Sequence, residues 1–195
     1  MLINLYLYVI IMLSSYYLLH KNNLLNFQGK KTILISISYV IISSVLCLNE
    51  TINHMDYFIK QGILFGILVI AMISISNNKM QSVYYALIIF IIVSSFDWLN
   101  LYLKVWYFNF NNLSMLVNLL IIVIIFVLDK YHFIQYSQLG LVYNIICMVG
   151  WMFISRSFLI VESKNPIYII VCLLIGWIFI NKMISVYNDK KTNIN

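Results

Sequence analysis

The sequence predicts an all-α fold, a polytopic transmembrane helix bundle, and two features of its composition carry this prediction. Of the 195 residues, 63% are hydrophobic and only 9% are charged, whereas a soluble domain carries about 25% charged residues. A soluble fold of this size needs a largely polar surface, so it could not hide so much apolar surface in one core. A lipid environment removes this conflict, because apolar side chains can then face outward.

The pattern of the apolar runs favours helices over strands. Only helices and closed barrels satisfy their backbone hydrogen bonds in hydrocarbon. Barrel strands alternate apolar and polar residues over about ten positions, but a run such as 119–128 is apolar without alternation. The chain has only 6 glycines and 1 proline, which favours continuous helices over the broken helices that many transporters use.

Seven segments are apolar enough to be expected as spans, since one crossing needs about 20 apolar residues. They are residues 2–19, 33–48, 58–76, 82–98, 113–128, 138–161 and 167–186. The second segment is the shortest, so a six-span arrangement with this segment at the interface is the alternative. We expect one transmembrane domain over residues 1–186, and a polar cytoplasmic tail over 187–195 that is disordered.

The lysines between the spans predict the orientation, because cytoplasmic loops carry an excess of Lys and Arg. If the N-terminus lies outside, the inner segments hold eight lysines and the outer segments hold three. The inner ones are Lys21, Lys30, Lys31, Lys79, Lys130, Lys182, Lys190 and Lys191, and the outer ones are Lys60, Lys104 and Lys164. We therefore expect the N-terminus outside and the C-terminus in the cytoplasm, in the plasma membrane of a bacterium.

Several classes of function find no support in the sequence. The net charge of +6 is spread between spans rather than gathered on a soluble domain, so we expect no nucleic-acid partner. The loops are too short for a soluble catalytic or nucleotide-binding module. The three histidines fall in separate loops and no His-Glu-x-x-His or Gly-x-Ser-x-Gly motif occurs, so we expect no metal and no cofactor.

The candidate ligand-binding residues are those whose polar groups fall near the outer ends of the spans. Arg156, the only arginine, lies within the sixth span, and Asp97 ends the fourth. Charges at such depth are costly and often functional, and an Asp97–Arg156 pair would lower the cost of burying both. With Asn100 and Trp106 they could line an outward-facing pocket. The alternative is that Arg156 only extends its side chain to the interface.

The most distinctive stretch is 97–109, which is rich in aromatic residues. One interpretation is an interfacial aromatic belt, because Trp and Tyr favour the headgroup layer. The spacing of Asp97, Trp106, Phe108 and Asn109 also resembles a motif of the lycopene cyclase domain family. These are small polytopic membrane proteins that act on carotenoids.

The resemblance implies a membrane enzyme that acts on a lipid or isoprenoid, but it stops short of the expected catalytic residues. The family pattern continues with acidic residues in the next span. Here that span, 113–128, has Asn118 as its only strongly polar residue and contains no carboxylate. The resemblance therefore reaches only the residues of the 97–109 stretch.

Gly62 and Gly66 are four residues apart at the start of the third span. Small residues at this spacing let another helix approach closely. We expect them to serve helix packing within the chain, with self-association as the alternative.

These observations favour a non-catalytic membrane protein that binds or senses a small or lipophilic ligand at its outer face, or that is a subunit of a larger complex. The expected partners are the lipid bilayer and either another membrane protein or a second copy of the chain. A lipid or isoprenoid enzyme is one alternative. A small-solute transporter is the other, with Asn118 and Asn144 as its best mid-span polar candidates.

Overall fold

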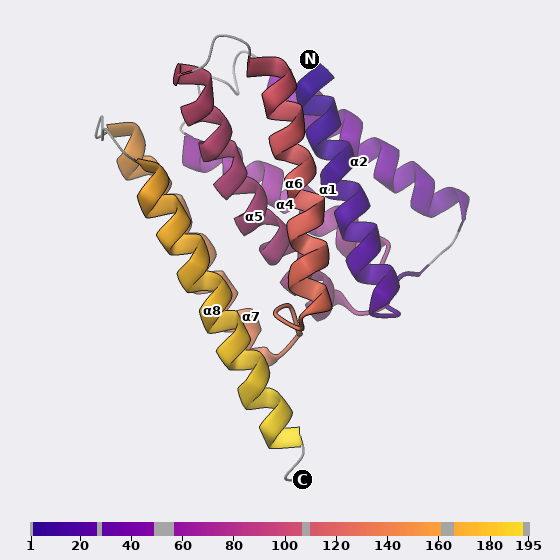
Figure 1. The fold of residues 1–195 in the computed structure, drawn as a ribbon. Helices are drawn as coiled ribbons and strands as arrows, with labels where there is room; N and C mark the ends of the chain where they lie inside the picture. The colour runs from indigo at the N-terminus through magenta and orange to yellow at the C-terminus, as the bar shows by residue number, and fades with distance from the viewer. Residues whose placement is uncertain (1, 27–28, 49–56, 107–109, 161–165, 193–195) are drawn as a thin grey trace.

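The computed structural model describes residues 2–26, 29–48, 57–106, 110–160 and 166–192, and over these residues the fold is helical. The helices are α1 (Leu2–Lys21), α2 (Lys30–Leu48), α4 (Tyr57–Ser74), α5 (Lys79–Trp106), α6 (Phe110–Lys130), α7 (Gln138–Ile160) and α8 (Pro166–Thr192). Consecutive helices run in alternating directions, so the two ends of the chain lie at opposite ends of the bundle (Figure 1). The predicted all-α class is confirmed, and the extended backbone in the described part of the chain is limited to one bridge between Leu25 and Ser76.

Three helical segments among the described residues are long and apolar enough to cross a membrane. They are Lys30–Leu48, Lys79–Asp97 and Ile169–Lys190. Two shorter apolar segments, Ile59–Ser74 and Gln138–Phe153, accompany them. The predicted membrane character is therefore supported, while the count of seven spans stays a prediction.

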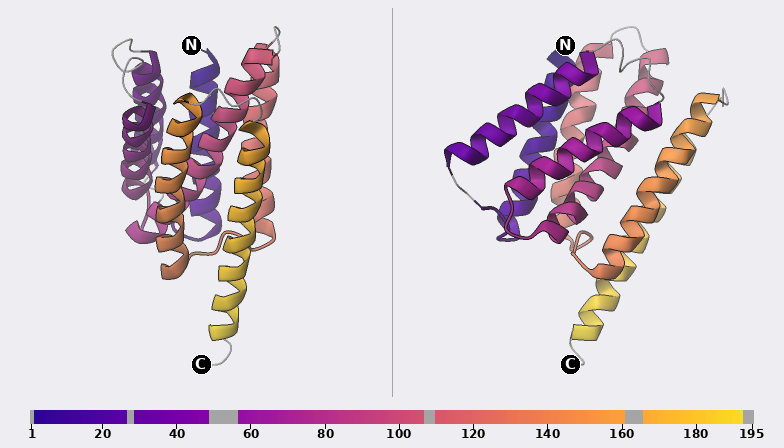
Figure 2. Two further views of the ribbon diagram at one scale, coloured as in Figure 1. Left: turned by 90° about the vertical axis from the view of Figure 1, so that its left-hand side faces the viewer. Right: turned by 180° about the vertical axis from the view of Figure 1, so that it is seen from behind.

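Helix α5 forms the centre of the bundle. It packs against α1, α4, α6, α7 and α8, and every side chain from 84 to 96 is buried. Its sequence explains this position, because a helix that is apolar all round is stable only when it is enclosed. Figure 2 shows α2 and α4 crossing one face of the bundle obliquely, with α7 and α8 paired at another side.

The peripheral helices bury their polar side chains and expose their apolar ones. In α2 the buried residues are Thr32, Tyr39, Ser43 and Ser44, while Ile33, Leu34, Ile37, Ile41, Ile42 and Val45 are exposed. Contiguous apolar surface on this scale is rare on soluble monomers. The arrangement is stable where the surroundings are hydrocarbon, because lipid then covers the apolar side chains and the polar ones are kept away from it.

Two predicted boundaries were wrong. Helix α5 continues to Trp106 and α6 begins at Phe110, so the long loop expected after residue 98 is largely helical. The tail expected to be disordered is helical up to Thr192. In both places the sequence lacks glycine and proline, so nothing in the chain stops a helix that has already formed.

A buried polar network joins α7 to α8. The side-chain amide of Asn144 donates to Oδ1 of Asn181 at 3.0 Å, and the indole N–H of Trp177 donates to Oδ1 of Asn144 at 2.8 Å. The amide of Asn181 also donates to the carbonyl of Trp177. All three side chains are buried, so the network fixes how the two helices are placed against each other.

Candidate functional site

Asp97, the one predicted ligand-binding residue whose side chain the structure describes, lies where α5 meets α4 and α1. The side-chain amide of Gln61 on α4 donates a hydrogen bond to its carboxylate. Lys60 and Tyr8 are near enough to interact with its charge. Tyr8 in turn contacts the Sγ of Cys47 on α2 at 2.8 Å. The structure therefore places Asp97 in a polar cluster of four helices at the end of the bundle where α1 begins.

The other predicted ligand-binding residues are placed by their helices alone. Asn100 and Trp106 lie on α5 and Arg156 lies on α7, but their side chains are outside the described residues. Helices α5 and α7 pack against each other. The helices that carry Asp97 and Arg156 are therefore neighbours, and the pairing of the two side chains stays a prediction.

Gly62 and Gly66 do not touch another helix closely within the described residues. A Cβ atom added at either glycine would meet nothing within 4 Å. The close helix approach expected at these positions is therefore not provided by the described part of this chain. Self-association, the alternative interpretation, stays open.

An apolar groove lies between α7, α8 and the middle of α5. It has a volume of about 290 Å³, near the lower end of the range for ligand pockets, about 300–1,000 Å³. Its lining is Ile91, Tyr143, Cys147, Gly150, Trp151, Cys172, Leu173, Leu174, Gly176, Trp177 and Ile180. We call this the α7–α8 groove.

Four small residues create the α7–α8 groove, two from each helix. They are Cys147 and Gly150 on α7, and Cys172 and Gly176 on α8. Small residues in membrane helices usually bring two backbones together. Here a Cβ atom added at Gly150 or Gly176 would meet nothing within 4 Å, so the small residues leave a space between the helices.

The polar groups in the wall of the groove are satisfied, with one exception. The Tyr143 hydroxyl bonds to the Cys147 thiol, and the Trp177 N–H donates to Asn144. The Nε1 of Trp151 is buried and has no acceptor. A buried donor without a partner costs about 1–3 kcal/mol. The groove is therefore an apolar channel with one unused hydrogen-bond donor in its wall.

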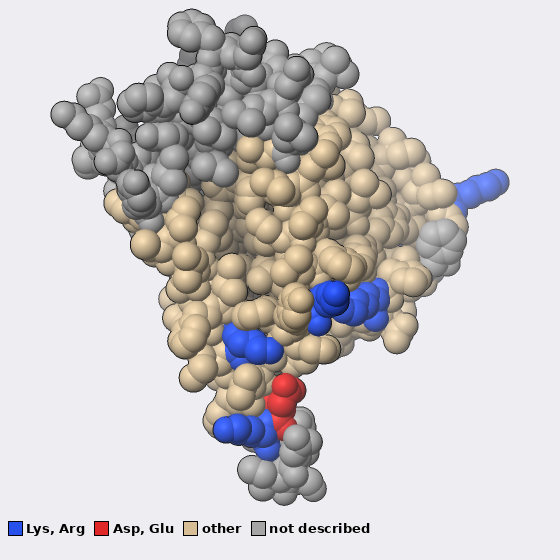
Figure 3. Space-filling model, in the orientation of Figure 1, with Lys and Arg blue, Asp and Glu red and all other residues tan. Residues whose placement is uncertain are grey.

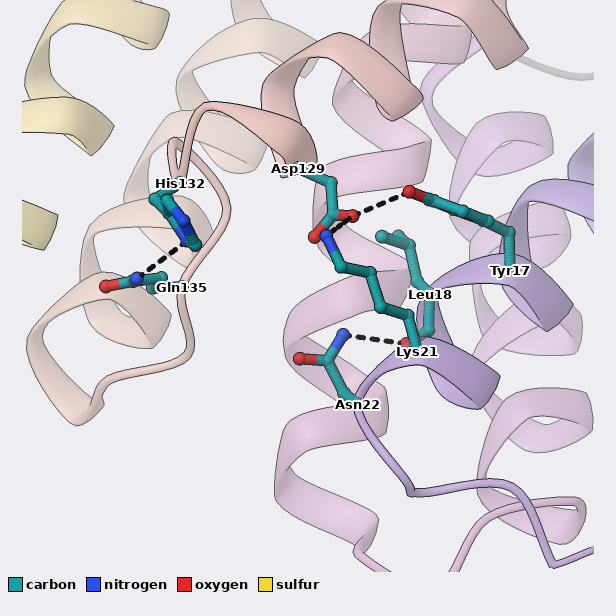
Figure 4. A network of polar contacts seen from close by, with 7 residues as sticks. All are labelled: Tyr17, Leu18, Lys21, Asn22, Asp129, His132 and Gln135. Atoms are coloured by element: carbon teal, nitrogen blue, oxygen red, sulfur yellow. Dashed lines mark hydrogen bonds and ion pairs between the residues drawn. The ribbon is translucent and has the colours of Figure 1, made fainter.

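A charged cluster lies where α1 and α6 end, at the end of the bundle opposite to the Asp97 cluster. The Lys21 ammonium forms an ion pair with the Asp129 carboxylate, and the Tyr17 hydroxyl donates to the same carboxylate at 2.8 Å. Figure 4 shows Asp129 between Tyr17 and Lys21, with the hydrogen-bonded pair His132 and Gln135 set apart from them. Asp129 is 6% exposed and Lys21 is 43% exposed, so the carboxylate is the buried partner.

The Lys21–Asp129 pair was not predicted. In the sequence, Lys21 counts only among the charges of an inner loop, and no role was expected for Asp129. The available signal was a lone carboxylate at the end of an apolar run, directly before Lys130. Such a residue needs a partner when it is buried, but the sequence does not say that α6 lies beside α1.

Among the described residues, no group of three or more His, Cys, Asp or Glu side chains could hold a metal ion. Comparisons of the chain with protein-family models, curated proteins and solved structures found no match.

Proposed function

We propose that this chain is a multi-pass membrane protein that binds a lipophilic molecule in the α7–α8 groove. The observation that carries the proposal is the space left by Gly150 and Gly176 between two helices that expose apolar side chains. A protein interior is packed to the density of an organic crystal. In a bilayer, an apolar space of this kind is filled by a hydrocarbon chain, which regains the dispersion contacts that its walls would otherwise lack.

The lining favours a ligand with a long apolar part and one oxygen that accepts a hydrogen bond. Nearly all of the wall is aliphatic, aromatic or sulfur, and the indole N–H of Trp151 is its strong hydrogen-bond donor without a partner. Its nitrogen is covered by neighbouring atoms, so the indole must turn to present the N–H to the ligand. An ester, ketone or hydroxyl oxygen on a lipid or isoprenoid fits this requirement.

The proposal includes the predicted topology of seven spans with the N-terminus outside and the C-terminus inside. The alternating helix directions support it, because an odd number of crossings puts the termini on opposite sides. The charges support it too. Figure 3 shows charged side chains along the lower and right-hand edge of the view, and an uncharged surface above them. Lys21 pairs with Asp129 and Lys182 donates to the carbonyl of Tyr131, so both lysines lie at the end of the bundle where α6 finishes.

Reporter fusions test the topology. We expect a green fluorescent protein fused after Asn195 to fluoresce and an alkaline phosphatase at the same place to be inactive, because the first folds in the cytoplasm and the second outside it. An N-terminal epitope tag should be labelled by antibody on spheroplasts without lysis. In the six-span alternative both termini lie inside, so an N-terminal tag labelled only after lysis would contradict seven spans.

The Trp151→Phe substitution tests the ligand site. Full-length protein is purified in a mild detergent, and the bound lipids are identified by native mass spectrometry. We expect one lipophilic species to be retained, and its affinity to fall about two- to tenfold in Trp151→Phe, as for the loss of one hydrogen bond. The melting temperature should stay close to that of the wild type, because that N–H has no hydrogen-bond partner within the protein.

Trp177→Phe is the contrasting variant. Its N–H donates to the buried Asn144, so its loss should lower the melting temperature. Retention of no specific lipid by the wild type, or equal affinities in wild type and Trp151→Phe, would contradict the assigned site. A bound lipid that is chemically altered in a manner dependent on Asp97 would instead favour the enzyme alternative.

A further inference from the structure

A second cavity lies at the opposite end of the bundle from the Asp97 cluster, beside the last turn of α1. It has a volume of about 960 Å³ and is lined by Tyr16, Tyr17, His20, Lys21, Asn23 and Leu25. In contrast to the α7–α8 groove, its lining includes basic and amide side chains. We call it the α1 end cavity.

A row of exposed side chains on α1 runs from apolar residues to this cavity. Leu5, Val9 and Leu13 are four residues apart and are 39%, 36% and 55% exposed. Residues at this spacing are neighbours on the surface of a helix, and the row continues through Tyr17 to Lys21 while turning by about 40° around the helix axis at each step. Along the helix the surface therefore changes from aliphatic to aromatic to cationic.

The Lys21 ammonium, at the cationic end of this row, has hydrogen-bond donors that are not used within the pair with Asp129. An ammonium has three N–H groups, and Lys21 uses one for Asp129, while its side chain is 43% exposed. His20 and Asn23 are also exposed and line the same cavity.

The two tyrosines of the cavity play a different part, because their hydroxyl protons are already used. The Tyr17 hydroxyl donates to Asp129, and the Tyr16 hydroxyl bonds to Ser36 and to the carbonyl of Thr32 on α2. Tyr17 also packs against Phe126 of α6, with ring centroids 5.7 Å apart. The tyrosines thus form firm walls between α1, α2 and α6, and the binding of an anion falls to Lys21, His20 and Asn23.

We infer that the α1 end cavity holds the phosphate headgroup of an anionic phospholipid, with an acyl chain lying along Leu13 and Val9. A phosphate oxygen accepts from the remaining Lys21 N–H groups, and the headgroup contacts His20 and Asn23. The order of chemistry along α1 matches that of a lipid, apolar chain first and anion last, at the depth where basic pockets between helices bind lipid headgroups. This inference rests on the membrane-spanning part of the proposed function and is independent of the α7–α8 groove.

Paired neutralisation tests the inference without leaving a buried charge unpaired. Lys21→Gln combined with Asp129→Asn keeps the net charge and replaces the ion pair by two amides that can still bond. Asp129→Asn alone is the matched control, because it keeps the Lys21 cation at the cavity. Full-length protein is titrated with phosphatidylglycerol, phosphatidylcholine or inorganic phosphate, and binding is measured by native mass spectrometry.

We expect one phosphatidylglycerol to bind saturably and phosphatidylcholine to bind about tenfold more weakly, because the choline cation beside its phosphate is repelled by the Lys21 ammonium. The double variant should lose about tenfold in phosphatidylglycerol affinity, His20→Ala should lose less, and Asp129→Asn should keep its affinity. Equal affinity in the double variant and the wild type overturns the inference. So does displacement of the lipid by millimolar inorganic phosphate, which would assign the cavity to a free anion. Failure of the wild-type chain in the topology test would contradict the proposed function, and this result can be told apart from the lipid-binding result.

Discussion

Gly176→Leu is expected to reduce occupancy of the α7–α8 groove by more than about tenfold, equivalent to about 1.4 kcal/mol of binding free energy, while the protein keeps its fold. A Cβ atom at Gly176 would meet nothing within 4 Å, so the leucine side chain has room in the groove itself. It then competes directly with the hydrocarbon chain of the ligand. Filling a cavity with an apolar side chain also tends to stabilise a protein, so the melting temperature should hold or rise.

Gly66→Leu is the matched control for this experiment. Gly66 is also a helical glycine with nothing within 4 Å of an added Cβ, but it lies on α4, outside the groove. Bound lipid is quantified by native mass spectrometry, and unfolding is followed by differential scanning fluorimetry. The groove assignment does not survive if Gly176→Leu keeps its lipid, or if Gly66→Leu loses as much.

Lys21→Met is expected to destabilise the protein by about 2–3 kcal/mol. Removal of one partner of a buried ion pair costs about 3–5 kcal/mol because the other charge is left uncompensated, and we reduce this range because Lys21 is 43% exposed. Asp129 is 6% exposed and would keep only the Tyr17 hydroxyl as partner. Asp129→Asn should cost less, since the Lys21 ammonium can reach water.

The combined Lys21→Gln and Asp129→Asn variant should recover most of the stability lost in Lys21→Met. In that variant no charge remains buried, so the penalty that dominates the single variant is absent. Thermal unfolding of all three proteins in one detergent measures the difference. A melting temperature for Lys21→Met equal to that of the wild type would show that the pair contributes nothing to the fold.

The fold class could be predicted because it depends on local properties of the sequence. Apolar runs without alternation, such as 119–128, identify helices, and the scarcity of glycine and proline predicts that they are unbroken. The same reasoning underestimated helix length at Trp106 and Thr192, because polar residues were taken as the ends of helices. A helix ends where its backbone is interrupted, and it can extend past the apolar region.

The site was harder to predict, because it depends on which helices are neighbours. Asp97 was identified as a candidate from its depth, but its hydrogen bond from Gln61 requires α4 to lie beside α5. The position of Trp151 within the sixth span could be predicted, but the surroundings of its N–H could not. That its N–H lacks an acceptor depends on the space that Gly150 and Gly176 leave nearby, and such a space has no signature in sequence spacing.

The enclosed position of α5 also bears on how the chain enters the membrane during translation. When α5 leaves the ribosome, α1, α2 and α4 are already made, but α6, α7 and α8 are not. Much of the α5 surface that is buried in the final fold is therefore in contact with lipid until those helices are made. Contact with lipid is not costly for this surface, because residues 84–93 include no charge and the hydroxyl of Ser95 donates to the carbonyl of Ile91 in its own helix. Lipid can thus cover this surface of α5 until α6, α7 and α8 displace the lipid.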